Sequence, residues 1–314
     1  MKKLLLAALC MLVATSVLAG CKSKEVRTVI SEIDSLGEIT LESEDKIRSI
    51  AEKYKALSEE EKQEVSNFDV LQTAEEKYQA IELENRMLGA IADDSTIDFD
   101  AMKDLSTEYD LLISDDQKVY FKENTYNDFR KKYDIMYLDH RIGEECVDVT
   151  SDSFGTLIEL NEEYEALDED RKAQITNSAL LAESLDASHT KKVNSIINNA
   201  NGYLDYAWEQ YNTYREYFTQ EEIEKCLISI GQWEAFKAAD KKLKSVMKNP
   251  SSYQRHSGSV SEPTIGFSSV DVKINYSGMN SFGGVTRDTE YLEVFLTIDP
   301  SAESPIKISG VFID

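Results

Sequence analysis

The chain has 314 residues, of which 34 are lysine or arginine and 59 are aspartate or glutamate, so its formal charge is −25. A surface this acidic disfavours binding to nucleic acid and to anionic lipid headgroups. Hydrophobic residues make up 41% of the chain. That is enough to build a packed core, and the length allows two or three domains.

Residues 1–20 have the pattern of a secretory signal peptide. Lys2 and Lys3 precede an apolar stretch over 4–13 that is too short to span a bilayer. We therefore exclude this segment from fold reasoning. The run LAGC that ends at Cys21 resembles the lipobox of bacterial lipoproteins. The resemblance implies a diacylglyceryl thioether on Cys21, and two acyl chains give stable membrane anchoring. The alternative is an ordinary cleavage site followed by a chance cysteine.

Export changes the interpretation of the remaining cysteines, Cys146 and Cys226. In an oxidising compartment they could form a disulfide. The alternative, which we favour, is that they are two small apolar residues of the core.

Next, the chain carries a motif that recurs every 55 residues. Tyr54, Tyr109 and Tyr164 mark three copies, and apolar residues stand seven and four positions before each of them. Regular spacing of this kind is typical of a repeat array. The apolar offsets lie on one face of a helix, and SEEE at 58–61 has the form of a capping box for a second, short helix. We predict three helical repeats within residues 21–192, with neighbouring copies sharing a long helix.

The stretch 52–78 resembles helical repeat modules that occur in tandem on Gram-positive (Firmicute) cell-surface proteins. The matching positions are Tyr54, Leu57, Lys62, Val65, Asn67, Leu71 and Ala74. The third copy keeps Lys172, Ile175, Asn177 and Leu181, whereas the second departs with Gln117, Tyr120 and Lys122. The resemblance implies a spacer or presentation role without catalytic residues.

Residues 193–231 continue the helical periodicity as a connector or a degenerate fourth repeat. This region is rich in aromatic residues. Tyr203, Tyr211, Tyr214 and Phe218 share one helical face and are expected in the core. Trp208 and Tyr217 lie off that face. They are candidates for a glycan or peptide platform, although packing is the alternative that we favour.

Residues 232–314 are predicted to form a small α+β module. A helix over 233–247 precedes three strands at 270–276, 291–298 and 306–313. A glycine-bearing hairpin loop joins the first two strands. The expected fold is therefore α+β: an elongated, mostly α-helical repeat array followed by a small C-terminal antiparallel sheet packed on a helix.

The sequence NPSS at 249–252, the loop NSFGG at 280–284 and Arg287 resemble a small C-terminal domain of Firmicute secreted and membrane-anchored proteins. The resemblance supplies no activity. Asn280, Phe282 and Arg287 are the candidate ligand-binding residues of this module.

The sequence lacks a recognisable catalytic or metal-binding pattern. His140, His189 and His256 are far apart, and the acidic pairs at 93–94 and 115–116 lack the calcium-loop pattern. We expect no catalytic residue, no metal and no cofactor. The predicted function is that of a lipid-anchored extracytoplasmic binding or scaffold protein, with a protein or a cell-wall glycan as its partner. A self-associating structural envelope protein is the alternative, and an enzyme of unrecognised type is less favoured.

Overall fold

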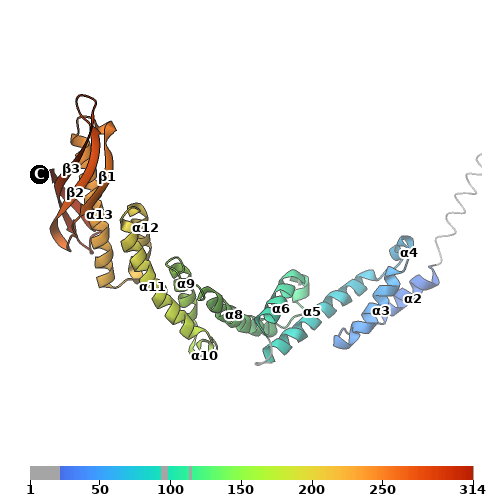
Figure 1. The fold of residues 1–314 in the computed structure, drawn as a ribbon. Helices are drawn as coiled ribbons and strands as arrows, with labels where there is room; N and C mark the ends of the chain where they lie inside the picture. The colour runs from blue at the N-terminus through green and yellow to red at the C-terminus, as the bar shows by residue number, and fades with distance from the viewer. Residues whose placement is uncertain (1–21, 93–97, 113–114, 314) are drawn as a thin grey trace, which may run out of the picture. The chain divides into compact units, whose positions relative to one another are not determined.

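A computed structural model describes residues 22–92, 98–112 and 115–313 (Figure 1). The predicted signal peptide, Cys21 and the pair at 93–94 lie outside the described residues, as do the side chains of the pair at 115–116. Helices are followed by a four-stranded antiparallel sheet, which confirms the predicted α+β class. The chain divides into two compact units, one ending at His140 and the other beginning at Arg141.

The first unit is helical throughout its described part. Its helices are α2 (Lys24–Asp34), η1 (Leu41–Ser43), α3 (Glu44–Lys55), α4 (Glu59–Gln63), α5 (Phe68–Ala92), α6 (Phe99–Leu112), α7 (Asp115–Lys118) and the larger part of α8 (Glu123–Glu145). The second unit continues with α9 (Phe154–Glu165), α10 (Glu169–Lys172), α11 (Ser178–Ala200), α12 (Leu204–Tyr214), η2 (Arg215–Tyr217), α13 (Gln220–Val246) and η3 (Pro250–Ser252).

Helix positions repeat with the period seen in the sequence. The first helix of each copy begins at Glu44, Phe99 and Phe154, and the long helix begins at Phe68, Glu123 and Ser178, so both recur every 55 residues. The short second helix is capped in the same way in the first and third copies. Ser58 accepts the backbone N–H of Glu61 at 3.3 Å, and Asp168 accepts that of Arg171 at 3.0 Å. These side chains satisfy backbone donors that the helix itself leaves free.

The marker tyrosines occupy related surroundings in two copies. Tyr54 stacks on Phe68 at 4.2 Å between ring centroids, and Tyr109 stacks on Tyr126 at 4.0 Å. Both partners lie in the first turn of the following long helix. In the third copy Tyr164 instead lies beneath the ammonium group of Lys172, at 5.4 Å.

Long helices are shared between successive bundles within each unit. The first half of α5 buries Leu71 and Ala74 against α2 and α3, and its second half buries Leu83 and Met87 against α6 and α8. Helix α11 likewise packs on α9 and on α12. Each bundle therefore completes its core with the end of the preceding long helix, as expected of a repeat array.

The C-terminal sheet has the strand order β1-β2-β3-β4, with β1 (Gln254–Val260), β2 (Gly266–Met279), β3 (Val285–Ile298) and β4 (Ile306–Ile313). Helix α13 covers one face of this sheet (Figure 1). The buried strand residues on that side are Val270, Val272, Ile274, Leu292, Val294, Leu296 and Ile298. A Cβ atom at Gly231 of α13 would lie 2.8 Å from Ile298 Cδ1, so glycine permits the close approach of helix and sheet.

Strand β1 was not predicted from the sequence. Its residues, QRHSGSV, are polar or small, and nearly all are exposed. An edge strand gains its order from pairing with its neighbour rather than from burial, so alternating hydrophobicity does not mark it. Pairing of Arg255 with Tyr276 and of Val260 with Val272 fixes its register.

Candidate functional site

The predicted NSFGG loop forms the turn of the β2–β3 hairpin. The side-chain oxygen of Asn280 accepts the backbone N–H groups of Phe282 at 3.0 Å and Gly284 at 2.9 Å. Gly283 has φ +81°, a conformation that favours glycine. Phe282 is 95% exposed at the tip. Asn280 is therefore committed to holding the turn, and Phe282 is the loop side chain presented to a partner.

Arg287 lies close to this loop on β3, where it pairs with Ser277 of β2. Its side chain is exposed, and it forms no ion pair within the part of the chain that the structure describes. The predicted group of Asn280, Phe282 and Arg287 is thus one neighbourhood at one end of the sheet.

Trp208 and Tyr217 do not lie together. The indole N–H of Trp208 donates to Glu234 at 2.9 Å, and the half-buried ring packs against the core. Tyr217 donates to Glu162 at 3.3 Å, beside Phe154. Tyr203, predicted to be in the core, is 69% exposed. That prediction was wrong because Tyr203 precedes the first residue of α12 and does not share its helical face.

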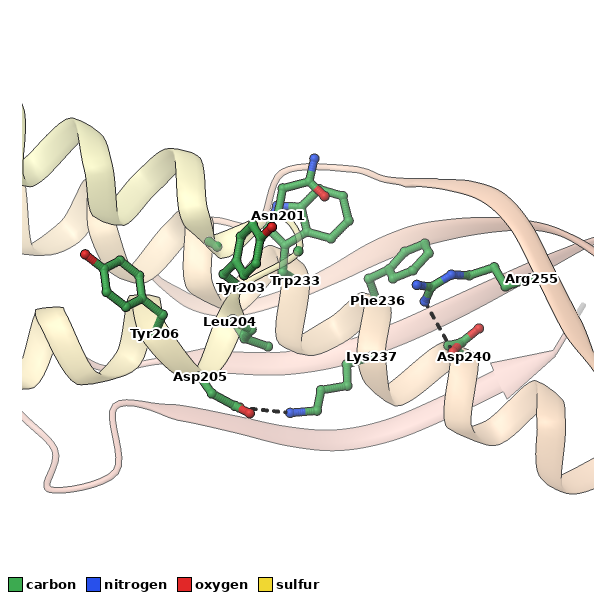
Figure 2. A pocket seen from close by; sticks show the side chains of 12 residues that line it. Asn201, Tyr203, Leu204, Asp205, Tyr206, Trp233, Phe236, Lys237, Asp240 and Arg255 are labelled. Carbon is green, nitrogen blue, oxygen red and sulfur yellow. Dashed lines mark hydrogen bonds and ion pairs between the residues drawn. The ribbon is translucent and has the colours of Figure 1, made fainter.

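A hollow of ≈ 460 Å³ gathers aromatic and charged side chains that are distant in sequence (Figure 2). The turn between α11 and α12 supplies Tyr203, and α12 supplies Tyr206 and Asp205. Helix α13 and strand β1 complete the lining with Trp233, Phe236, Lys237, Asp240 and Arg255. Gly202, with φ +112°, allows the chain to reverse here.

Two ion pairs lie within the lining of the hollow. Lys237 Nζ lies 3.5 Å from Asp205 Oδ1, and an Arg255 guanidinium nitrogen lies 3.3 Å from Asp240 Oδ2. The Arg255 guanidinium also lies over the ring of Phe236, at 5.1 Å from its centroid.

Tyr253 anchors the second pair through a hydrogen bond that it donates to Asp240. Burial, and then this hydrogen bond, raise the pKa of Tyr253 above its usual value. The phenol therefore stays protonated and continues to donate. Both carboxylates of the hollow are matched by a cation, so the site offers aromatic faces and fixed hydrogen-bonding groups rather than an unpaired acid and base.

The histidines and cysteines are dispersed. His140 stacks on Phe99, His189 lies between Phe154 and Phe218, and His256 contacts Ser277. Among the described residues, no group of three or more histidine, cysteine or acidic side chains is arranged to hold a metal ion. Cys146 and Cys226 are both buried and unpaired. Burial raises the pKa of the Cys226 thiol to about 12, which keeps it neutral.

Comparisons with protein-family models, curated proteins and solved structures found no match. The candidate site therefore rests on the residues themselves. In the part of the chain that is described, none of the helices combines the length and apolar character needed to cross a bilayer.

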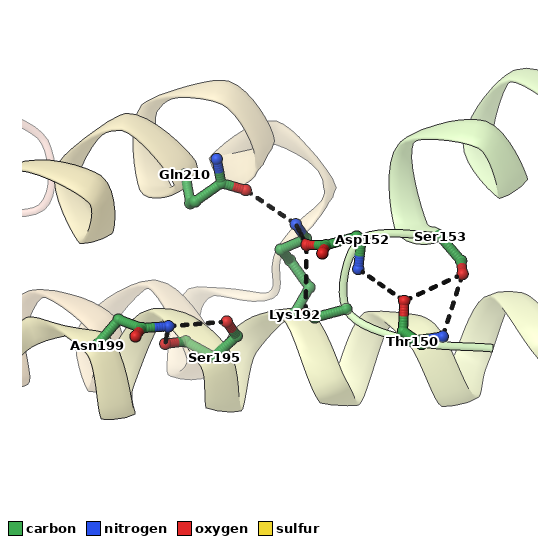
Figure 3. A network of polar contacts seen from close by, with 8 residues as sticks. Thr150, Asp152, Ser153, Lys192, Ser195, Asn199 and Gln210 are labelled. Carbon is green, nitrogen blue, oxygen red and sulfur yellow. Dashed lines mark hydrogen bonds and ion pairs between the residues drawn. The ribbon is translucent and has the colours of Figure 1, made fainter. Parts of the chain in front are cut away.

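A second polar feature surrounds the buried ammonium group of Lys192 on α11 (Figure 3). The Lys192 side chain is 2% exposed; its Nζ donates to Gln210 Oε1 at 2.8 Å and lies 3.9 Å from Asp152 Oδ1. The ring of Tyr214 faces the same nitrogen at 4.7 Å from its centroid. Lys192 thus ties the loop before α9 to α12. Burial lowers its pKa, although the carboxylate of Asp152 opposes this effect.

Sequence reasoning missed Tyr203, Trp233, Asp240, Arg255 and Lys192. Trp233 stood at the start of the predicted covering helix, and Arg255 stood in a segment taken as a connection. The available signal was the aromatic density of 203–218 together with the nearby Trp233. Their convergence depends on the packing of α12 and β1 around α13, which no local pattern reveals.

Proposed function

We propose that this protein is a membrane-anchored extracytoplasmic lipoprotein that acts as a binding or scaffold protein. In this proposal Cys21 carries the lipid, the helical repeats serve as a spacer, and the C-terminal module is the interaction domain. The proposal extends to the likeness with Firmicute surface proteins, which rests on the motifs in the sequence.

The distribution of exposed aromatic side chains carries the proposal. Apart from Tyr137 on α8, the large exposed aromatic residues of the described chain all follow residue 202: Tyr203, Tyr206, Tyr217, Phe267, Phe282, Tyr291 and Phe312. Aromatic side chains are enriched at recognition surfaces because they bury much area at little entropic cost. The repeats instead bury the same positions in each copy, as a spacer would.

The hollow in Figure 2 is the proposed ligand site of this module. Its size and its mixture of aromatic faces with fixed polar groups suit a sugar unit of a cell-wall glycan or a short peptide segment. The pairing of Asp205 and Asp240 with cations supports binding rather than acid–base catalysis.

Site-specific photo-cross-linking on living cells tests the proposal. A photoreactive phenylalanine analogue is placed at Tyr203, at Phe282 or, as the matched control on a repeat helix, at Tyr137. We expect adducts with a protein or glycan at the first two positions and far fewer at Tyr137. Equal labelling at all three positions would contradict the assignment of the C-terminal module as the interaction domain.

The anchor is tested separately with Cys21→Ala. Membrane fractionation with mass spectrometry of the N-terminal peptide should show a lipidated Cys21 in the natural chain and release of the variant into the medium. An unmodified cysteine in the membrane fraction would remove the lipid anchor from the proposal.

The alternative, a self-associating envelope protein, is favoured by one observation. The sheet face opposite α13 carries Phe267, Phe295 and Phe312, whose rings contact one another. Phe267 and Phe312 are 68% and 57% exposed. Analytical ultracentrifugation of residues 22–314 distinguishes the two functions, because a strict monomer argues against assembly.

A further inference from the structure

The strongly acidic chain contains one region without acidic residues. No aspartate or glutamate occurs within 241–261 or within 272–287. The basic residues of these segments are Lys241, Lys242, Lys244, Lys248, Arg255, Lys273 and Arg287. The net charge of the whole chain therefore conceals a local excess of positive charge.

The structure brings the two acid-free segments together. Strand β1 pairs with β2 from Gln254 opposite Ser277 to Val260 opposite Val272. The end of α13 reaches the same hairpin, since the Lys248 Nζ lies 3.5 Å from Ser281 Oγ and Ser252 Oγ accepts the backbone N–H of Met279. We call this end of the module, residues 241–253 with 276–287, the basic tip.

The lysines of the basic tip are free of acidic partners. Lys241, Lys242, Lys244 and Lys248 are exposed, and none of them forms an ion pair with any described residue. The nearest acidic groups on adjoining elements are Asp240, which is paired with Arg255, and Asp288 and Glu290 on β3 beside Tyr276. Unpaired cations in a chain with a large excess of acid are available to an external anion.

Apolar side chains project from the same tip. Phe282 is 95% exposed, Val285 73%, Val246 53% and Met279 40%. The two hydrogen bonds to Asn280 hold the loop that carries Phe282. The loop projects at the end of the sheet (Figure 1), so its apolar side chains lie on a convex surface.

We propose that the basic tip docks on an anionic lipid bilayer, with Phe282 and Val285 entering the interfacial region and the lysines meeting the headgroups. A bilayer supplies both kinds of contact at once: anionic headgroups attract basic clusters, and the acyl boundary accepts apolar side chains. A soluble polyanion would satisfy the lysines and leave the apolar tip in water. The inference rests on the proposed role of the C-terminal module as the interaction domain and names its partner.

Vesicle flotation of residues 22–314 tests the inference, since this chain lacks Cys21 and holds every described helix and strand. Vesicles of phosphatidylcholine mixed with phosphatidylglycerol are compared with phosphatidylcholine alone, at low and high salt. We expect binding to the anionic vesicles that weakens with salt. F282S should weaken binding about tenfold because a large apolar side chain no longer enters the interface. Lys244→Gln with Lys248→Gln should weaken it by about fivefold for each lysine.

Two control variants use exposed residues of β4. Phe312→Ser removes an exposed aromatic side chain, and Lys307→Gln removes an exposed cation, both away from the tip. Neither should change vesicle binding, and circular dichroism should show that all variants are folded.

Equal binding to neutral vesicles, undiminished binding of F282S, or binding to soluble polyphosphate without binding to vesicles would overturn the inference. The proposed function has a separate outcome. If vesicles are not bound but the photoreactive group at Phe282 captures a protein or glycan on cells, bilayer docking is wrong and the module remains an interaction domain. If both experiments fail, both proposals fall.

Discussion

At the scale of single residues, Lys192 is the least expected feature of the molecule. A buried ammonium group loses its hydration, and the compensation here comes from Gln210, the ring of Tyr214 and the more distant Asp152. Its lowered pKa shows that burial outweighs these contacts. Lys192 therefore orients α12 and the loop before α9 at a cost in stability.

The pH dependence of unfolding should reveal this cost. The unfolded chain keeps the Lys192 proton up to the usual value near 10.5, whereas the folded chain releases it earlier. Between these two pKa values the unfolded state binds more protons, so stability rises with pH and levels off above the unfolded value. We expect urea midpoints of residues 22–314 to show this rise and Lys192→Met to remove it. The control Lys191→Met, which alters an exposed neighbour, should retain it. Persistence of the rise in Lys192→Met would show that another group causes it.

At the scale of elements, a side chain from one helix completes the next. Glu84 of α5 is 7% exposed, and its Oε1 accepts the backbone N–H of Lys122 at 3.1 Å and the hydroxyl of Thr125 at 2.8 Å. These donors lie at the start of α8, where a helix has free N–H groups and a favourable dipole for anions. The carboxylate thus joins two long helices of neighbouring bundles.

Removing this cap should destabilise the first unit. Glu84→Ala leaves buried donors without an acceptor, so we expect a loss of about 2 kcal/mol in the free energy of unfolding, measured by urea denaturation. Glu84→Gln keeps an acceptor oxygen and should lose less. Glu82→Ala on the same helix removes only an exposed ion pair with Arg86 and should cost less than about 1 kcal/mol. Equal effects at positions 82 and 84 would show that Glu84 does not act as a cap.

At the scale of the whole molecule, the repeat period defines which segments are interchangeable. Both the first and the long helices recur every 55 residues, and each bundle takes part of its core from the preceding long helix. A chain built in this way should tolerate removal of one complete period better than removal of a similar length out of phase.

Deletion of residues 99–153, one period, joins Asp98 to Phe154 and replaces the start of α6 by the start of α9. We expect a folded protein with the helical signal of the remaining copies and a cooperative thermal transition by circular dichroism. Deletion of 106–160 removes the same number of residues but fuses the middle of α6 to the last turn of α9, so it should lose cooperativity. Similar melting of both deletions would contradict the role of the period.

The sequence by itself determined the period, the helix starts, the caps at Ser58, Asp168 and Thr219, and the β2–β3 hairpin. These features depend on residues a few positions apart, because capping, helical periodicity and turn chemistry are short-range effects. Only the tertiary structure decided that polar β1 pairs at the sheet edge and that Tyr203, Trp233 and Arg255 line one hollow. It also decided that Lys192 is buried and that two acid-free segments form one tip, because these outcomes depend on which distant surfaces pack together.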